Sequence, residues 1–445
     1  MTIPIISWSL RTLPLAAIIS SMKTLLGATM TMLALVRTSD AQTIPVIDLP
    51  AATAMSSQRF SIVSGLRVAP DGSVLVNDAF GLQLTRLDST LTHATIVLGS
   101  TEGATESYGT LPSRLVPYLG DSSLFPDAAS GTLHVRDPNG KMIRAIAAPV
   151  GVSFAFLHGT LATRPSGTDN RGRLIFAGGL PPTGDSSAIL RADFDARTID
   201  TIGRVRLRDG GTQTVDSTVP GKIKYTLVIN PLPSLDGWAV LSDGSVAIVR
   251  TQDYHIDWIL PDGSRHSSPK LPFDWRRLTD EEKRGIIDSA KAANGARNPT
   301  PPPGRGGSGS GGGRSGQSGV AVAKGADRSG DPSAVAPRTP QIDVQYYEPS
   351  QIGDYIPPLR YNGVLPDADG NLWIVPSTST LSKHGELVYD VINPTVGLFE
   401  RVRIPEGRSI AGFGRGGVIF LVAGDRKSGY TLERTRLPGG PARPR

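Results

Sequence analysis

The sequence predicts an all-β protein folded as a six-bladed β-propeller, and three observations lead to this fold class. The 445 residues include 51 Gly and 36 Pro, and only 19% of residues are charged. Gly and Pro are unfavourable inside helices and common in turns. A Gly-containing turn followed by an apolar strand recurs six times along the chain. The copies are spaced at about the length of one propeller blade. Many short strands joined by turns are therefore expected.

The recurring unit can be aligned by its glycine. The six glycines are Gly72, Gly120, Gly172, Gly244, Gly370 and Gly417. Apart from two longer gaps they are separated by about 50 residues, and a four-stranded blade takes about 40 to 50. A Gly in such a turn accepts the positive φ that a tight hairpin requires. Each copy therefore predicts the second strand of a blade.

The sixth blade has only three strands in the C-terminal region, near residues 409–413, 418–422 and 430–437. The β-prone segment 44–49 is predicted to supply the missing strand and close the ring. Closure is expected because an unpaired sheet edge promotes aggregation, and propellers leave only short, protected edges. The propeller then spans residues 42–437, with a flexible tail over 438–445. A seventh blade is an alternative if residues 205–240 contain further strands.

The N-terminus has the pattern of a secretory signal peptide, assigned to residues 1–41. Lys23 precedes an apolar run over 24–36, and small residues follow at 39 and 41. The run is shorter than the about 20 residues that span a bilayer. We therefore expect a secreted or periplasmic protein of a bacterial envelope, with no stable transmembrane segment once the signal is removed. An uncleaved anchor is the alternative, and Met22 is an alternative start to Met1.

Composition excludes several classes of site. The chain has no Cys, which removes disulfides, thiolate metal sites and Cys nucleophiles. The net charge of +6 is too small to indicate a nucleic-acid partner. The six His show no His-x-x-x-His spacing, and there is no Gly-x-Ser-x-Gly elbow. The sequence thus predicts no metal site, no cofactor and no local catalytic motif.

The pattern Gly-x-Val-x-Val-x-Asp, which begins at Gly72 and ends at Asp78, repeats loosely in the other copies. It resembles bacterial NHL-like and TolB-like six-bladed propellers over residues 44–437, apart from one insertion. The resemblance implies the fold and implies no activity.

The insertion covers residues 269–358, between the fourth and fifth blades. Thr279 and Glu282 form a capping box, which predicts a helix over 280–293 that docks through Leu278, Ile286, Ile287 and Ala290. A Gly/Ser-rich tract follows, and residues 298–340 are predicted to be disordered. Segments 99–113, 208–233 and 269–358 all connect a fourth strand to the next blade. They should gather on one rim of the ring, where repeat proteins commonly bind partners.

Five polar residues lie at or just after the ends of second strands, and hence on this rim. The candidate ligand-binding residues are Asp78, Asp127, Arg250, Asp253 and Arg426. In addition, His255 and Asp257 share a strand face with Asp253. Three tyrosines of the insertion form a candidate aromatic lip: Tyr346, Tyr347 and Tyr355.

The leading hypothesis is an exported, monomeric, non-enzymatic propeller that binds or scaffolds a protein, peptide or glycan through the loop-rich rim. The alternative is a periplasmic hydrolase, lactonase or lyase with a metal or acid-base site at the mouth of the central channel. In that case Asp78, Asp127 and Asp253 are candidate ligands. A third hypothesis makes the insertion a tether to another envelope protein.

Overall fold

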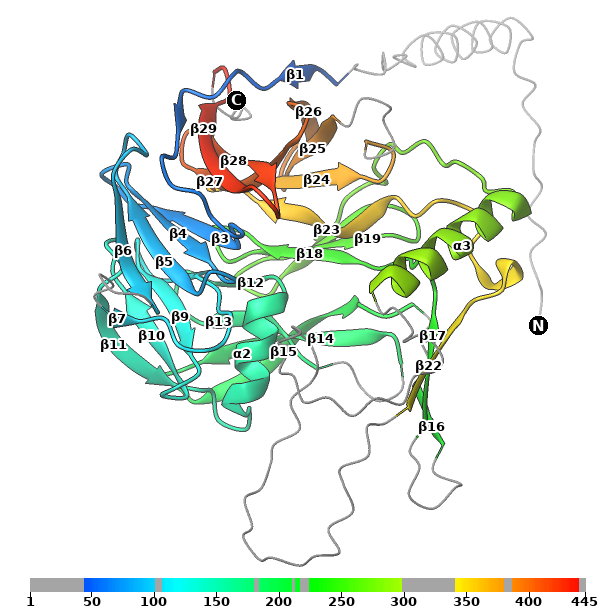
Figure 1. Cartoon of the computed structure of the whole chain (residues 1–445), viewed down its shortest axis with the longest axis horizontal. Coiled ribbons are helices and arrows are strands. Elements are labelled where there is room, and N and C mark those ends of the chain that lie inside the picture. The colour runs from blue at the N-terminus through cyan, green and yellow to red at the C-terminus, as the bar shows by residue number, and fades with distance from the viewer. Residues whose placement is uncertain are drawn as a thin grey trace, which may run out of the picture. The chain divides into compact units, whose positions relative to one another are not determined.

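A computed structural model describes residues 44–100, 106–179, 184–209, 213–216, 224–297, 341–379 and 386–439. Six mainly antiparallel sheets of at least four strands are arranged in a ring (Figure 1). This confirms the six-bladed β-propeller. The proposed signal peptide, the 298–340 segment and most of the C-terminal tail lie outside the described residues.

The blades follow one another along the chain. Blade 1 contains β3 (Gly65–Val68), β4 (Val74–Asp78), β5 (Gln83–Leu87), β6 (Ala94–Gly99) and the added β7 (Glu106–Ser107). Blade 2 contains β8 (Val116–Pro117), β9 (Ser123–Asp127), β10 (Thr132–Arg136) and β11 (Met142–Ala147). Blade 3 contains β12 (Ser166–Thr168), β13 (Leu174–Ala177), β14 (Ser186–Asp193) and β15 (Thr198–Arg206).

The second half of the ring repeats this arrangement. Blade 4 contains β18 (Gly237–Val240), β19 (Val246–Arg250), β20 (His255–Ile259) and β21 (Arg265–Ser267). Blade 5 contains β23 (Leu359–Pro366), β24 (Leu372–Pro376), β25 (Leu387–Asn393) and β26 (Gly397–Ile404). Blade 6 contains β27 (Arg408–Gly414), β28 (Val418–Asp425) and β29 (Gly429–Arg436).

Each predicted turn leads into the second strand of its blade. In blade 4, Gly244 has φ +88°, and the Asp243 carboxylate accepts hydrogen bonds from the backbone N–H and the hydroxyl of Ser245. Asp71 and Ser73 repeat these contacts in blade 1. The Asp-Gly-Ser triplet therefore closes the hairpin through both its glycine and its side chains.

The N-terminal segment closes the ring differently from the prediction. β1 (Val46–Asp48) pairs in parallel with β26 of blade 5. The added strand of blade 6 is instead β2 (Ala54–Met55), antiparallel to β29. The assignment of residues 44–49 to blade 6 is thus wrong, because this segment pairs with the outer edge of blade 5 and the chain reaches β29 only at Ala54. The shorter and less β-prone β2 therefore supplies the added strand of blade 6.

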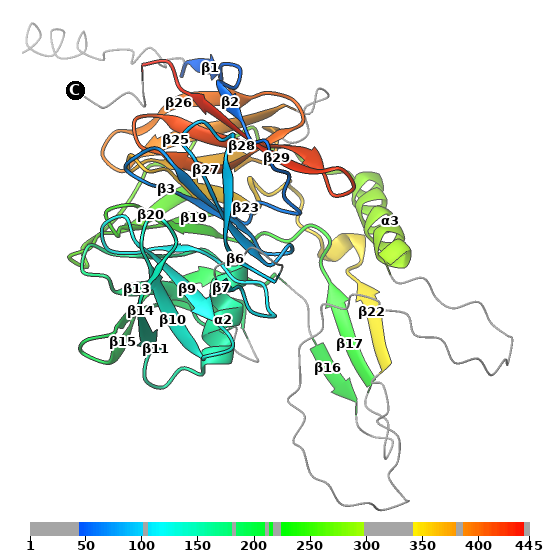
Figure 2. The ribbon, with the colours of Figure 1, turned by 60° about the vertical axis from the view of Figure 1, so that its left-hand side comes forward.

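The alternative of a seventh blade is also wrong. The region between blades 3 and 4 contributes β16 (Gln213–Asp216) and β17 (Lys224–Ile229). These strands pair with β22 (Gln341–Tyr346) from the insertion, and together they form a three-stranded accessory sheet (Figure 2). β17 and β22 are parallel and more than a hundred residues apart, so no local sequence pattern indicates their pairing.

In the described part of the chain, two α-helices and one short 3-10 helix lie in connections between blades. α3 (Asp280–Arg297) confirms the predicted helix and extends it by four residues. Leu278 and Ile287 are buried on its docking side, with Ile286 and Ala290 half-buried. η1 (Pro349–Gln351) faces α3 across the insertion. α2 (Phe154–Thr163), between blades 2 and 3, was not predicted. None of the described helices is both long and apolar enough to cross a membrane.

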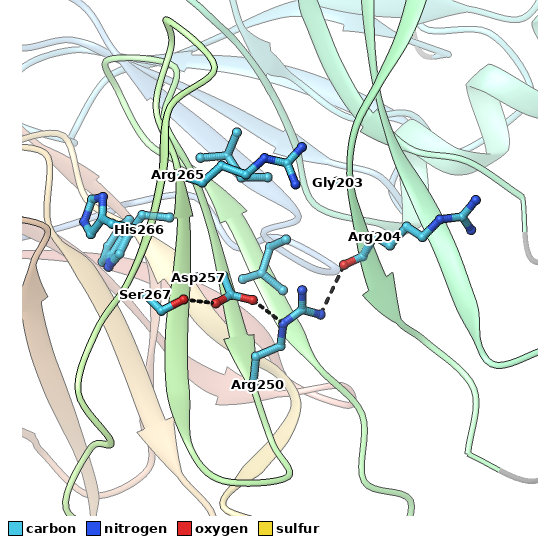
Figure 3. A pocket seen from close by; sticks show the side chains of 10 residues that line it. Gly203, Arg204, Arg250, Asp257, Arg265, His266 and Ser267 are labelled. Carbon is cyan, nitrogen blue, oxygen red and sulfur yellow. Dashed lines mark hydrogen bonds and ion pairs between the residues drawn. The ribbon is translucent and has the colours of Figure 1, made fainter. Parts of the chain in front are cut away.

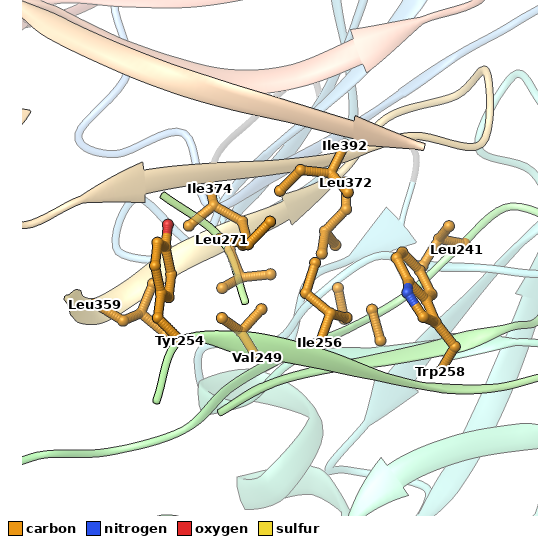
Figure 4. Close-up of a cluster of buried hydrophobic side chains, with 13 residues drawn as sticks. Leu241, Val249, Tyr254, Ile256, Trp258, Leu271, Leu359, Leu372, Ile374 and Ile392 are labelled. Atoms are coloured by element: carbon orange, nitrogen blue, oxygen red, sulfur yellow. The ribbon is translucent and has the colours of Figure 1, made fainter. Parts of the chain in front are cut away.

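Apolar side chains fill the spaces between neighbouring blades. In β20, Ile256 and Trp258, with Tyr254 just before the strand, face blade 5 and pack against Leu372 and Ile374 (Figure 4). His255 and Asp257 lie on the opposite face, as strand periodicity predicts. That face is turned toward blade 3, where Ile259 packs with Ile189.

Candidate functional site

Asp78, at the end of β4, is buried and holds its own loop. Its carboxylate accepts hydrogen bonds from the backbone N–H groups of Ser61, Ile62 and Gly81. The Asp78 side chain therefore joins the segment that precedes β3, at Ser61 and Ile62, to the turn that follows β4, at Gly81.

Asp127 occupies the equivalent place in blade 2. It accepts hydrogen bonds from the backbone N–H groups of Ala129 and Ser130, at 3.4 and 2.9 Å. His134 Nε2 lies 3.6 Å from its Oδ2. Burial acts to raise the pKa of Asp127, but the side chain and backbone N–H of Ser130, the backbone N–H of Ala129 and, least, His134 outweigh burial and lower the pKa. The carboxylate is thus held ionised in a local turn.

Arg426 is exposed in the hairpin between β28 and β29. The neighbouring Asp425 closes that hairpin by accepting from the backbone N–H groups of Lys427 and Ser428. In the described part of the chain, no ion pair joins Arg426 to another candidate residue.

Arg250 and Asp253 are the two candidates that the structure brings together. Arg250 Nε donates to Asp257 Oδ2 at 2.7 Å. His255 then bridges two carboxylates, with Nδ1 2.6 Å from Asp253 Oδ1 and Nε2 3.2 Å from Asp257 Oδ1. Both contacts are hydrogen bonds when both ring nitrogens carry protons. We call Asp236, Arg250, Asp253, His255 and Asp257 the blade 4 polar network.

Asp236 is the member of this network that sequence reasoning missed. It precedes β18, and its Oδ2 lies 2.7 Å from Arg250 Nη1. It also accepts from the backbone N–H of Arg206 in blade 3. Its position before a first strand resembles many other loop positions, so nothing in the local sequence distinguishes it.

The charges in the network stabilise one another. Burial acts to lower the pKa of Arg250, but its hydrogen bonds to Asp257 and Asp236 outweigh burial and raise the pKa. The hydrogen bond from His255 lowers the pKa of Asp253. Burial acts to raise the pKa of Asp257, but hydrogen bonds from Ser267 and Arg250 lower it. Arg250, Asp253 and Asp257 are therefore all charged at neutral pH.

A cleft of about 260 Å³ lies beside this network, between blades 3 and 4 (Figure 3). Gly203 and Arg204 of β15 form one wall, and Arg250 and Arg265 of blade 4 form the other. Ile248 and Ile259 line its inner part. The cleft thus combines guanidinium groups with an apolar floor.

The three carboxylates considered as metal ligands do not form a metal site. Among the described residues, no group of three or more His, Asp or Glu side chains is arranged to hold a metal ion. Asp78 and Asp127 bind backbone N–H groups in their own blades, whereas Asp253 binds His255. They therefore do not converge on one point.

More of the exposed large apolar side chains lie on the rim that carries the connections between blades than on the opposite rim. We call this rim the connection rim. Its exposed large apolar residues, the apolar rim set, are Phe80, Leu111, Val150, Phe156, Trp275 and Tyr355. Phe80 lies between the second and third strands of blade 1, and the other five lie in connections from one blade to the next. On the turns of the opposite rim, only Leu119 and Val396 are exposed large apolar residues in the described structure.

An aromatic pair is the most prominent part of this set. Trp275 and Tyr355 are 41% and 47% exposed, and their rings meet edge to face at 6.3 Å. Of the three predicted lip tyrosines, Tyr355 is thus exposed, whereas Tyr346 is half-buried and donates its hydroxyl to the carbonyl of Ala290 in α3. Tyr347 is also half-buried.

Solved structures similar to this chain are propeller-type proteins. A virginiamycin B lyase from Staphylococcus aureus is 12% identical with a TM-score of 0.35, over 85% of this chain and 98% of that one. A gluconolactonase from Xanthomonas campestris is 10% identical with a TM-score of 0.35, over 87% and 88%. A calcium-binding regucalcin from Agrobacterium tumefaciens is 11% identical with a TM-score of 0.35, over 89% and 98%.

No protein-family model matches this chain, and no curated protein matches it. The similar structures have different activities in their names, and likenesses this distant carry no argument about activity.

Proposed function

We propose that this protein is an exported, non-enzymatic binding propeller that recognises a protein or an extended peptide through its connection rim. The observation that carries the proposal is the asymmetry of exposed apolar side chains. Among the residues that the structure describes, six large apolar side chains are exposed on the connections of this rim, against two on the turns of the opposite rim. Gatherings of exposed apolar side chains with polar neighbours are typical of interaction sites.

The aromatic pair gives the proposed interface an anchor. Trp275 contacts Phe273 edge to face at 5.1 Å, and Phe273 contacts the buried Tyr254 at 5.6 Å. The exposed rings are therefore held by the core between blades 4 and 5. Trp and Tyr are enriched among the residues that dominate binding energy, and rigid anchors lose little entropy on binding.

Polar groups surround the anchor. Arg277 and Asp354 are largely exposed and lie within 3.6 Å of each other, and Arg277 forms a backbone bridge with Tyr355. A polar rim around an apolar centre is the usual composition of a protein interface. This composition favours a monomeric protein that binds a partner through this surface, which the propeller ring holds in a fixed position.

The test compares partner capture by matched surface variants. The immobilised chain is incubated with envelope extract from the source organism, and bound proteins are identified by cross-linking mass spectrometry. A captured partner is then titrated against purified Trp275→Ala/Tyr355→Ala and against Leu119→Ala/Val396→Ala on the opposite rim. Loss of two anchor side chains should weaken binding by about 30-fold or more. The control should bind as the unaltered protein does.

Two outcomes would overturn the proposal. Cross-links that map to the opposite rim or to the outer strands would place the interface elsewhere. Equal affinity of the Trp275→Ala/Tyr355→Ala protein and the control would show that the aromatic pair contributes nothing to binding.

A further inference from the structure

Two arginines of blade 4 are anchored to neighbouring carbonyls of blade 3. Arg265 Nη2 donates to the carbonyl of Ile202 at 2.7 Å, and Arg250 Nη1 donates to the carbonyl of Arg204 at 3.1 Å. Both carbonyls belong to β15, the outer edge strand of blade 3, and Gly203 lies between them. The two guanidinium groups are therefore fixed on either side of Gly203, across the cleft between the blades (Figure 3).

The backbone of β15 is irregular at this point. Its pairing with β14 shifts register so that Leu190 opposes Thr201 and Ile189 opposes Gly203, which leaves Ile202 as an extra residue. A Cβ atom on Gly203 would lie 2.8 Å from Ile259 Cδ1. Bulges and close-approach glycines often occur beside functional sites. Here the bulge and Gly203 allow the backbone of β15, including the carbonyl of Ile202, to approach Arg250 and Arg265 closely.

Some N–H donors of the Arg250 and Arg265 guanidinium groups are not used in these contacts. Each guanidinium has five N–H donors. Among the described residues, Nη2 of Arg250 and both Nε and Nη1 of Arg265 have no hydrogen-bond partner. Within the same described ranges, Arg265 also has no carboxylate in ion-pair distance. Its charge is held in place by a neutral carbonyl and is not neutralised.

Both oxygens of the Asp257 carboxylate in the cleft already accept hydrogen bonds. Asp257 Oδ2 accepts from Arg250, and Oδ1 accepts from Ser267 Oγ at 2.6 Å and contacts His255. The guanidinium groups of Arg250 and Arg265 face this aspartate and Gly203, whereas Arg204 presents its carbonyl and its side chain points away (Figure 3). Asp236 and Asp257 both pair with Arg250, so among the described residues the guanidinium without a paired carboxylate is that of Arg265, beside an apolar floor of Ile248 and Ile259.

We propose that this cleft is a binding site for a small oxyanion, the carboxylate or phosphate group of a low-molecular-weight ligand. The oxyanion bridges the free donors of Arg265 and Arg250, since guanidinium groups bind such oxygens through paired, charge-assisted hydrogen bonds. The volume of about 260 Å³ holds the anionic group with a short apolar substituent. No residue of the apolar rim set lines this cleft, so either proposal can fail alone.

The experiment is calorimetric titration of the full mature chain at constant ionic strength, with inorganic phosphate in one arm and acetate in the other. We expect saturable binding at one site in at least one arm, and the arm that binds more tightly identifies the preferred oxyanion. Arg265→Gln should weaken that binding by about tenfold or more, because it removes a charged donor pair.

The matched control is Arg144→Gln, which alters an exposed arginine on the outermost strand of blade 2. Its binding should be unchanged. Arg250→Lys retains a positive charge beside Asp236 and Asp257, but it should also weaken binding because Lys lacks the planar fork. The proposal is overturned if neither anion binds, or if Arg265→Gln binds as tightly as Arg144→Gln.

Discussion

At the scale of single residues, the sequence placed polar side chains correctly at strand ends but could not identify their partners. Asp78 was predicted at the end of a second strand, where β4 does end. Two of its three hydrogen-bond donors, Ser61 and Ile62, lie 17 and 16 residues earlier in the chain. No local pattern links these positions, so the same aspartate could be read as a ligand or as a structural group.

Replacement of Asp78 by Ala separates these two roles. It removes a buried charged acceptor from three backbone N–H groups, and we expect a loss of about 3 kcal/mol in the free energy of unfolding, measured with denaturant. Asp71→Ala is the control, because Asp71 also closes a turn but its side chain is 59% exposed. That change should lower the free energy of unfolding much less, because the exposed Asp71 carboxylate is solvated in both the folded and the unfolded chain. Unaltered stability of Asp78→Ala would contradict the structural role and leave the ligand role open.

At the scale of elements, local chemistry was predictable and long-range pairing was not. The capping box of α3 could be recognised because its residues are three apart. Glu282 Oε2 accepts from the Thr279 N–H at 2.8 Å, and the Glu282 N–H donates to Thr279 Oγ1 at 3.2 Å. α2 was missed because its sequence is apolar all round and contains Gly159, so no helical periodicity appears.

The capping box should control the stability of α3 without affecting the ring. Thr279→Ala removes the side-chain cap, and we expect a local cost of about 1 kcal/mol. Hydrogen exchange should become faster for the first-turn amides of α3 and remain unchanged in β19. Ser289→Ala alters the same helix at a mid-helix serine that only bonds back to the Gly285 carbonyl, and it should leave exchange unchanged. Equal exchange in both variants would show that contacts such as Lys283 with Asp354 hold the helix alone.

At the scale of the whole molecule, the number of blades was predictable because it repeats, whereas the closure of the ring occurs once. Residues 44–49 were the more β-prone choice, yet β2 pairs with β29. Two further hydrogen bonds strengthen that junction, from Thr53 N–H to the Arg434 carbonyl and from Ser56 N–H to the Leu432 carbonyl. The cleft between blades 3 and 4 could not be predicted from the sequence either, because its lining residues come from segments that are not adjacent in sequence.

Chains that begin at residues 44, 52 and 58 measure what each N-terminal strand contributes. The chain from 52 lacks β1 but keeps β2, so it should lose the parallel pairing with β26 and the buried Leu49 and still close blade 6. The chain from 58 lacks both strands and leaves the edge of β29 unpaired beyond the bridge between Phe60 and Tyr430. Exposed sheet edges recruit other chains, so we expect a lower Tm together with concentration-dependent association in analytical ultracentrifugation for this chain alone.

The Tm values and association states of the three chains show which strand closes the ring. If β2 does so, the largest fall in Tm occurs between the starts at 52 and 58, and the chains from 44 and 52 both remain monomeric. If the main loss and the onset of association occur between 44 and 52, β1 and its contacts carry the closure in solution. The chain from 44 is the reference, because it keeps every strand that the structure describes.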